Sequence, residues 1–239
     1  MLNLSKGRSF KCFVAWLLSA LGAAPQLHAN VIQISNLTDP IFGGATYQSG
    51  TAKISSFSGL PDLTTVSSIT DGALIAGFSN AVTKATVPAT FSTWGLPPDT
   101  ESPTPAVLNT FANPNPSVRT LAFSKPIEVF GVEVEGGDFD AAGFTMDFFS
   151  GATLLGSISR TVVGDGSARV LAGESGVPFD SVVITDHLAS GDNSFAMAEV
   201  RYSFAAVPEP DSVLLLGGGF GLLLGAARLR KTYPRVAKT

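Results

Sequence analysis

Apolar and polar residues alternate along several short stretches of this chain, and that period of two limits the fold more than any other feature. In residues 194–204 every second residue is apolar, whereas Glu199, Arg201 and Ser203 stand between the apolar positions. Successive side chains of a β-strand point to opposite faces of the sheet, so this alternation predicts a half-buried strand. The residues predicted to face the core are Ala196, Ala198, Val200, Tyr202 and Phe204.

Similar stretches follow one another about every ten residues. In residues 128–135, for example, Phe130 and Val132 alternate with glycine and glutamate. Glycine, aspartate and proline fill the gaps between stretches and are typical of turns. This spacing predicts an all-β fold, an antiparallel β-sandwich or jelly roll, over residues 30–206. The other predicted strands are residues 31–35, 51–57, 63–69, 73–78, 81–87, 117–123, 143–149, 153–160, 168–172 and 179–185.

A proline-rich stretch interrupts the pattern at residues 93–117. It holds 6 prolines, and each one lacks the backbone N–H that a strand ladder needs. The stretch is therefore predicted to be a long loop of the domain. Trp94 lies at its start, where an exposed indole could stack on a sugar ring, although so large an aromatic also serves as a core or loop anchor.

Residues 1–29 have the character of a secretory signal peptide. A basic start precedes an uncharged, largely apolar run at residues 12–24, and Ala29 offers a small residue at the cleavage point. The run has 13 residues, fewer than the ~20 that span a bilayer as a helix. We therefore expect export through the Sec machinery and cleavage after Ala29.

The remaining chain is acidic and lacks cysteine. Residues 30–206 contain 7 Lys or Arg and 17 Asp or Glu, a net charge of −10. Such a surface repels phosphate backbones, so nucleic acid is not expected as a partner, whereas hydroxylated polymers and cations are compatible. Because the only cysteine, Cys12, lies in the signal peptide, the processed chain forms no disulfide and depends on an apolar core.

Residues suited to catalysis are few. His187 is the only histidine after removal of the signal peptide. Its neighbour Asp186 would point to the opposite face of a strand and could not orient the imidazole. No catalytic residue is assigned, and the chain is predicted not to be an enzyme.

Four acidic residues surround a Gly-Gly turn near the middle of the chain. Their oxygens suit Ca²⁺, although the calcium-loop spacing is absent and acids around a turn also serve solubility. Two of them could instead flank a cleft and hydrolyse a glycoside. The four residues are Glu133, Glu135, Asp138 and Asp140. No other cofactor is predicted.

Residues 207–239 form a tail of a different character. Val207 and the Pro208-Glu209-Pro210 motif give an extended joint, and residues 213–227 carry no charge. As a helix that run measures about 22 Å, short of the ~30 Å hydrocarbon core. The basic residues after it, which orient this end toward the cytoplasm, are Arg228, Arg230 and Lys231. A permanent membrane anchor is the alternative interpretation.

The Pro-Glu-Pro motif, the Leu/Gly-rich run and the basic end together resemble the PEP-CTERM sorting signal of exported bacterial proteins. The resemblance implies recognition by an exosortase, a membrane protease, with Pro208, Glu209 and Pro210 as the motif. It also implies brief residence in the inner membrane and then the cell surface or extracellular matrix. Hosts of such proteins often make exopolysaccharide and biofilm, which makes exopolysaccharide an implied partner.

These features lead to one hypothesis and two alternatives. The hypothesis is a non-enzymatic, exported β-sandwich protein at the cell surface or in the biofilm matrix that binds exopolysaccharide. The alternatives are a secreted carbohydrate-active enzyme and a permanently anchored single-pass membrane protein.

Overall fold

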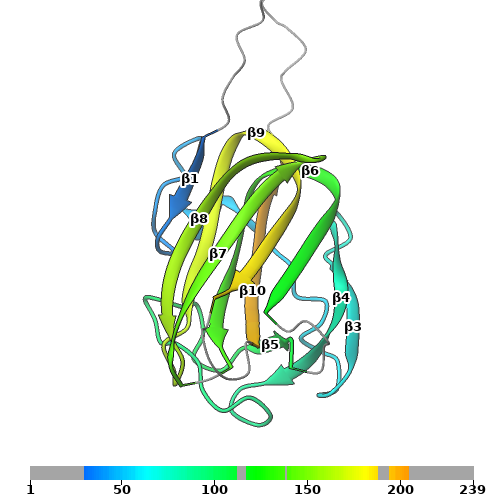
Figure 1. Cartoon of the computed structure of the whole chain (residues 1–239), viewed down its shortest axis with the longest axis vertical. Helices are drawn as coiled ribbons and strands as arrows, with labels where there is room; N and C mark the ends of the chain where they lie inside the picture. The colour runs from blue at the N-terminus through cyan, green and yellow to red at the C-terminus, as the bar shows by residue number, and fades with distance from the viewer. Residues whose placement is uncertain (1–29, 112–116, 138, 188–193, 205–239) are drawn as a thin grey trace, which may run out of the picture.

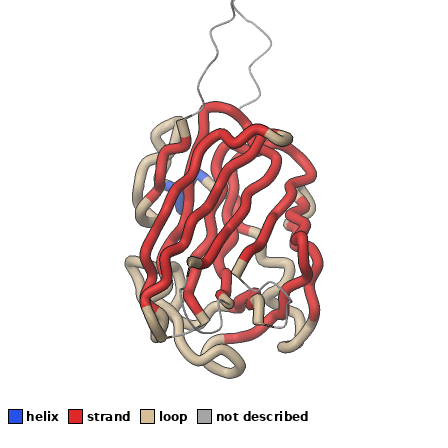
Figure 2. The backbone as a smooth tube through the Cα atoms, viewed as in Figure 1, coloured by secondary structure: helices blue, strands red, loops and turns tan. Residues whose placement is uncertain are grey.

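The computed structural model describes residues 30–111, 117–137, 139–187 and 194–204, and nearly all of the regular structure there is antiparallel strand. Figure 2 shows this dominance of strand over helix. One helix of four residues, α2 (Tyr47–Gly50), occurs within those ranges. None of the described helical structure has the length and apolar character needed to cross a bilayer. The predicted signal peptide with Ala29 and the whole tail at residues 207–239 lie outside the described residues.

Ten strands form one hydrogen-bonded sheet (Figure 1). Its order is β2-β10-β5-β4-β6-β9-β7-β8, and β1 pairs with β9 while β3 pairs with β4. Strand β10 also pairs with β6, which closes a ring of β10, β5, β4 and β6. The strands are β1 (Val31–Ile34), β2 (Ala52–Lys53), β3 (Thr65–Thr70), β4 (Ile75–Thr86), β5 (Ala106–Asn109), β6 (Val118–Gly136), β7 (Ala141–Ser150), β8 (Thr153–Val163), β9 (Arg169–Asp186) and β10 (Phe195–Phe204).

Strands β6 and β9 are long because each runs through two layers. The ladder between them is regular on both sides but shifts register between Ala122 and Val129. Pro126 in β6 and Pro178 in β9 fall in this interval and cannot donate ladder hydrogen bonds. The two strands therefore cross together from one layer to the other, as in sandwiches whose strands change sheets at bends.

The main core lies between these layers and is rich in phenylalanine. The rings of Phe148 and Phe179 meet edge to face at 5.0 Å, and Phe123 lies 4.9 Å from Phe130. All four belong to one cluster of buried residues. Burial of this apolar surface is the main force that stabilises the domain.

Strand β10 differs from the alternation that its sequence predicts. A bulge lies between Ala198 and Arg201, where Glu199 has φ +49°. The extra residue reverses the faces, so Met197 shares the main core with Val200, whereas Ala198 belongs to a separate cluster. The prediction of one continuous face from Ala196 to Phe204 was therefore wrong.

The proline-rich stretch contains a strand that was predicted to be absent. Residues of β5 are mostly buried, and the strand pairs with both β4 and β10. It occupies four consecutive positions without proline, just after Pro105. Elsewhere, the predicted strand at residues 51–57 shortens to β2, and three pairs of predicted strands join into β4, β6 and β9.

Candidate functional site

The carboxyl end of β6 brings two glutamates under a loop. Val132 and Val134 face the main core, so the alternation of the strand places Glu133 and Glu135 on the other face. The loop after β4 covers that face and leaves each glutamate only 1 % exposed. Buried carboxyl groups need hydrogen-bond partners, and the loop provides them.

Glu133 holds the loop to the sheet. Its carboxyl oxygens accept a 2.9 Å hydrogen bond from the indole N–H of Trp94 and a 2.6 Å bond from the backbone N–H of Glu101. Burial raises the pKa of Glu133 to about 7, although these two donors oppose the rise. Glu133 therefore changes its charge near neutral pH while it anchors the loop.

Trp94 anchors this loop and is not an exposed ring on which a sugar could stack. The side chain is 4 % exposed and belongs to a small buried cluster with Ala196 and Ala198. Of the two interpretations that the sequence left open for Trp94, the structure supports the loop anchor, because a side chain with 4 % exposure cannot offer a face to a sugar ring. Its edge-to-face contact with Phe91, at 5.9 Å, fixes a second ring nearer the surface.

Glu135 differs from Glu133 because one of its oxygens remains without a donor. Oε1 accepts hydrogen bonds from the Thr93 hydroxyl at 2.7 Å and from the backbone N–H of Gly166 at 2.9 Å. Oε2 is buried and has no hydrogen-bond partner among the described residues. Such an oxygen costs free energy unless a ligand or water donates to it.

Glu135 lines a pocket of about 160 Å³ at the end of the sandwich. Three phenylalanines line it as well, and Phe139 is 69 % exposed while Phe111 is 46 % exposed. None of the described lining residues carries a positive charge. The lining residues are Thr90, Phe91, Ser92, Thr93, Phe111, Glu135, Gly136, Gly137, Phe139 and Asp165.

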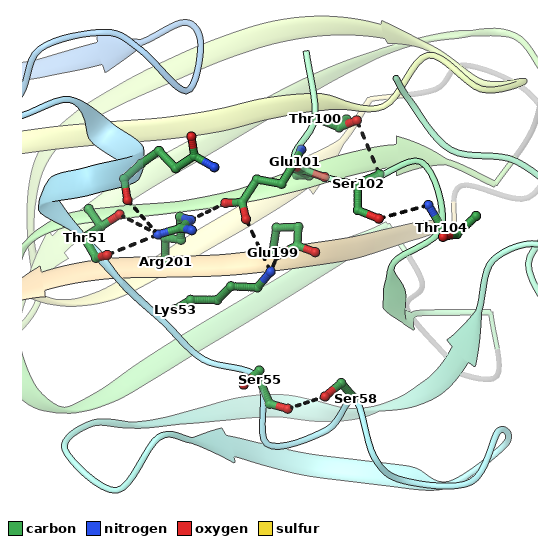
Figure 3. A network of polar contacts seen from close by, with 12 residues as sticks. Thr51, Lys53, Ser55, Ser58, Thr100, Glu101, Ser102, Thr104, Glu199 and Arg201 are labelled. Atoms are coloured by element: carbon green, nitrogen blue, oxygen red, sulfur yellow. Dashed lines mark hydrogen bonds and ion pairs between the residues drawn. The ribbon is translucent and has the colours of Figure 1, made fainter. Parts of the chain in front are cut away.

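An ion-pair network fixes the other end of the same loop (Figure 3). Glu101 pairs with Arg201 of β10 and lies 3.3 Å from the Lys53 ammonium, which also pairs with Glu199. Burial acts to raise the pKa of Glu101, but hydrogen bonding and the charge of Arg201 hold it below the ordinary value. Arg201 also donates to the carbonyl oxygens of Gln48 and Thr51, which ties α2 and the loop to one strand.

Of the four acids predicted to surround the Gly-Gly turn, the structure describes three, and these do not form a metal-binding group. Glu133 and Glu135 are buried under the loop, Asp140 is exposed, and Asp138 lies outside the described residues. No group of three potential metal ligands occurs in the described ranges. The calcium site therefore stays a prediction of the sequence.

His187 follows β9 directly. Its side chain is exposed, whereas that of Asp186 is buried. The imidazole Nε2 lies 2.9 Å from the Thr145 hydroxyl on the neighbouring strand.

Sequence reasoning missed the phenylalanines of the pocket. Phe111 lies within the stretch predicted to be a loop, and Phe139 follows the Gly-Gly turn, so both positions indicated only loops or turns. The one available signal was the presence of phenylalanine at two turns, where exposed aromatic rings are uncommon.

Comparisons with known proteins give no family. The sequence matches no protein-family model and no curated protein. Among solved structures, a family 29 carbohydrate-binding module from Piromyces equi is similar at a TM-score of 0.30 and 12 % identity, over 76 % of this chain and 94 % of that one. The enzymatically active domain of bacteriophage CBA120 tailspike protein 4 gives a TM-score of 0.29 and 16 % identity, over 56 % of this chain and 20 % of that chain. This chain thus spans about a fifth of the tailspike domain.

Proposed function

We propose that this protein is an exported, non-enzymatic binding protein that holds a polysaccharide chain at the Glu135 pocket. The observation that carries the proposal is the buried Oε2 of Glu135, which has no donor among the described residues and belongs to a pocket with two exposed phenylalanine rings. Carbohydrate hydroxyl groups donate hydrogen bonds, and the C–H faces of sugar rings pack on aromatic rings. Such a combination of apolar walls and a few fixed polar groups is typical of small-molecule sites.

The position of the pocket suits display away from a membrane. Val31 pairs with Ser175 and Phe204 pairs with Ile127, so the described chain begins and ends where β6 and β9 bend. Gly136, at the pocket, pairs with Phe195 at the opposite end of β10. A domain held by a tail after Phe204 would present this pocket on its far side.

Sorting through the tail is part of the same proposal. Its support is the order of Pro208-Glu209-Pro210, the uncharged run and the basic residues Arg228, Arg230 and Lys231. Mass spectrometry of the protein from its host should find a chain that starts near Asn30 and ends near the Pro-Glu-Pro motif. Surface-located protein that retains residues 228–239 would contradict processing and favour a permanent anchor.

One observation favours a binding protein over an enzyme. Glu133 does not line the pocket, and both of its carboxyl oxygens already accept N–H donors. A glycoside hydrolase needs two carboxyl groups across a cleft, and Glu135 and Asp165 are the described acids that line this pocket. Incubation of the protein with host exopolysaccharide should give binding without new reducing ends, whereas new ends that disappear in Glu135→Gln would establish a glycoside hydrolase.

Binding should depend on the exposed rings of the pocket. The purified full chain is titrated with exopolysaccharide fragments, and Phe139→Ala and Phe111→Ala are each expected to weaken binding about fivefold, since they remove ring contacts. Phe42→Ala is the matched control, because Phe42 is 50 % exposed but does not line the pocket. Equal affinities for all three variants and the parent chain would refute the pocket as the site.

A further inference from the structure

We propose that the pocket selects an amino sugar whose nitrogen carries no acetyl group and is therefore a primary ammonium. This inference rests on the proposed function and specifies the chemistry of its ligand. Its starting point is Glu135 Oε2, an acceptor that is buried within the domain yet belongs to a side chain that lines the pocket. A ligand that reaches this oxygen gains a hydrogen bond by donating to it.

The charges around the pocket favour a cationic donor. Asp165 lines the mouth with a second carboxyl group, and no described lining residue is basic. Residues 30–206 carry a net charge of −10, so the domain as a whole attracts cations. An ammonium group has three N–H donors and forms stronger hydrogen bonds with a carboxylate than a hydroxyl group does.

The fixed geometry of Glu135 supports recognition of one donor in one place. The Thr93 hydroxyl and the Gly166 N–H both bind Oε1, so the carboxyl group is oriented and Oε2 is left for the ligand. Gly166 has φ +83°, and the Trp94 carbonyl oxygen lies 3.3 Å from the position of an added Cβ, so glycine suits this turn. The acceptor is thus held in place before the ligand arrives.

The aromatic rings supply the second element of selectivity. Phenylalanine faces attract cations within about 6 Å of the ring centre, and they also pack against sugar C–H groups. Phe91, Phe111 and Phe139 line the pocket together with Glu135. An acetylated nitrogen loses the positive charge and gains bulk in a pocket of about 160 Å³, well under the ~300 Å³ of a typical drug-sized site.

The test compares two oligosaccharides that differ only at nitrogen. The full chain is titrated by calorimetry with a β-1,4-linked glucosamine hexamer and with the N-acetylglucosamine hexamer. We expect the amine form to bind at least about tenfold more tightly, and Glu135→Gln to remove that preference. Glu128→Gln, on the same strand but not in the pocket, has the same change of charge and should retain it.

The possible outcomes distinguish polysaccharide binding at the pocket from the preference for a primary amine. Equal, Glu135-dependent binding of both hexamers would overturn the amine inference and leave polysaccharide binding intact. Absence of binding to these hexamers and to host exopolysaccharide would overturn both. Preference for the amine form that persists in Glu135→Gln would indicate non-specific attraction to an acidic surface and overturn the inference, as would Ca²⁺ alone binding at Glu135.

Circular dichroism of Glu135→Gln separates loss of folding from loss of binding. If that variant unfolds, Phe139→Ala provides the test, because this ring is 69 % exposed and its removal leaves the core intact. The expected result is a larger loss of affinity for the amine hexamer than for the acetylated one. An equal loss for both would contradict recognition of the charge.

Discussion

At the scale of single residues, Glu133 and Glu135 show how neighbouring positions of one strand face acquire different roles. Both are 1 % exposed and both lie under the same loop. Two N–H donors occupy the two oxygens of Glu133, whereas both donors to Glu135 bind one oxygen. Glu133 therefore anchors the loop, whereas Glu135 retains a buried oxygen to which none of the described residues donates.

The raised pKa of Glu133 predicts a stability that falls as pH rises. The unfolded pKa is 4.5 and the folded pKa about 7, so the folded protein binds the proton more tightly. The contribution of protonated Glu133 to the free energy of unfolding is complete below pH ~4.5. It is lost as pH rises to ~7, by at most about 1.4 kcal/mol per pH unit. Urea unfolding from pH 5 to 8 should show a shallower decline for Glu133→Gln than for the parent chain.

The control for this prediction is Glu128→Gln, which changes a carboxyl group of the same strand that is only partly buried. Its pH profile should match that of the parent chain. A Glu133→Gln profile parallel to the parent would show that Glu133 titrates normally in the folded protein.

Trp94 gives a second prediction at the residue scale. Trp94→Phe retains a ring in the cluster but leaves one buried oxygen of Glu133 without its 2.9 Å donor. We expect the free energy of unfolding to fall by about 1–3 kcal/mol. Trp94→Phe introduced into the Glu133→Leu variant should lower the free energy of unfolding by less, since the carboxyl oxygen is then absent. An equal loss in both backgrounds would show that the effect comes from packing alone.

At the scale of elements, close contact between β6, β9 and α2 depends on glycine. A Cβ at Gly131 would overlap the Ala172 side chain and the Tyr47 hydroxyl. Tyr47 is 1 % exposed and lies in the small cluster that packs α2 on the sheet. Gly131 therefore lets the helix approach the strand closely.

Gly131→Ala is accordingly expected to destabilise the domain by about 2 kcal/mol or more, because overpacking moves backbone. Gly77→Ala in β4 is the matched control, since its Cβ would meet only the Ala122 carbonyl oxygen at 3.9 Å. Thermal unfolding should show a lower Tm for the first variant and a small change for the second. Equal Tm values would mean that α2 moves without cost.

At the scale of the whole molecule, β6 and β9 join the two layers into one unit. Each strand pairs in both layers, and β10, β5, β4 and β6 pair in a closed ring. Neither layer can lose its pairing without disturbing the other. The architecture therefore favours unfolding as a single cooperative step.

The chain processed after Ala29 offers a direct measurement, since Trp94 is then its only tryptophan. Trp94 fluorescence reports the opening of the loop that covers Glu133, and far-ultraviolet circular dichroism reports the unfolding of the strands. The two urea midpoints should coincide. An earlier fluorescence transition would show that the loop over Glu133 opens before the sandwich unfolds.

The fold class and most strands followed from the sequence by itself, for a local physical reason. The alternation in Phe130, Val132 and Val134 reflects burial of one face, which neighbouring residues alone can encode. Turn residues correctly marked the ends of most strands. They could not show that β6 continues through Pro126 and β9 through Pro178, where the strands only bend. A proline interrupts the hydrogen-bond ladder whether the strand bends there or ends there. Only the pairing of the residues on either side of the proline distinguishes the two.

The site depended on contacts between residues far apart in the chain, which no local pattern encodes. Trp94 binds Glu133 across 39 positions, and Gly166 reaches Glu135 across 31. The sequence determined that two glutamates would share a face of β6. Only the tertiary structure decided that a loop would bury that face, cover Trp94 and leave one buried oxygen of Glu135 without a donor among the described residues, because covering a strand face requires the whole chain to fold around it.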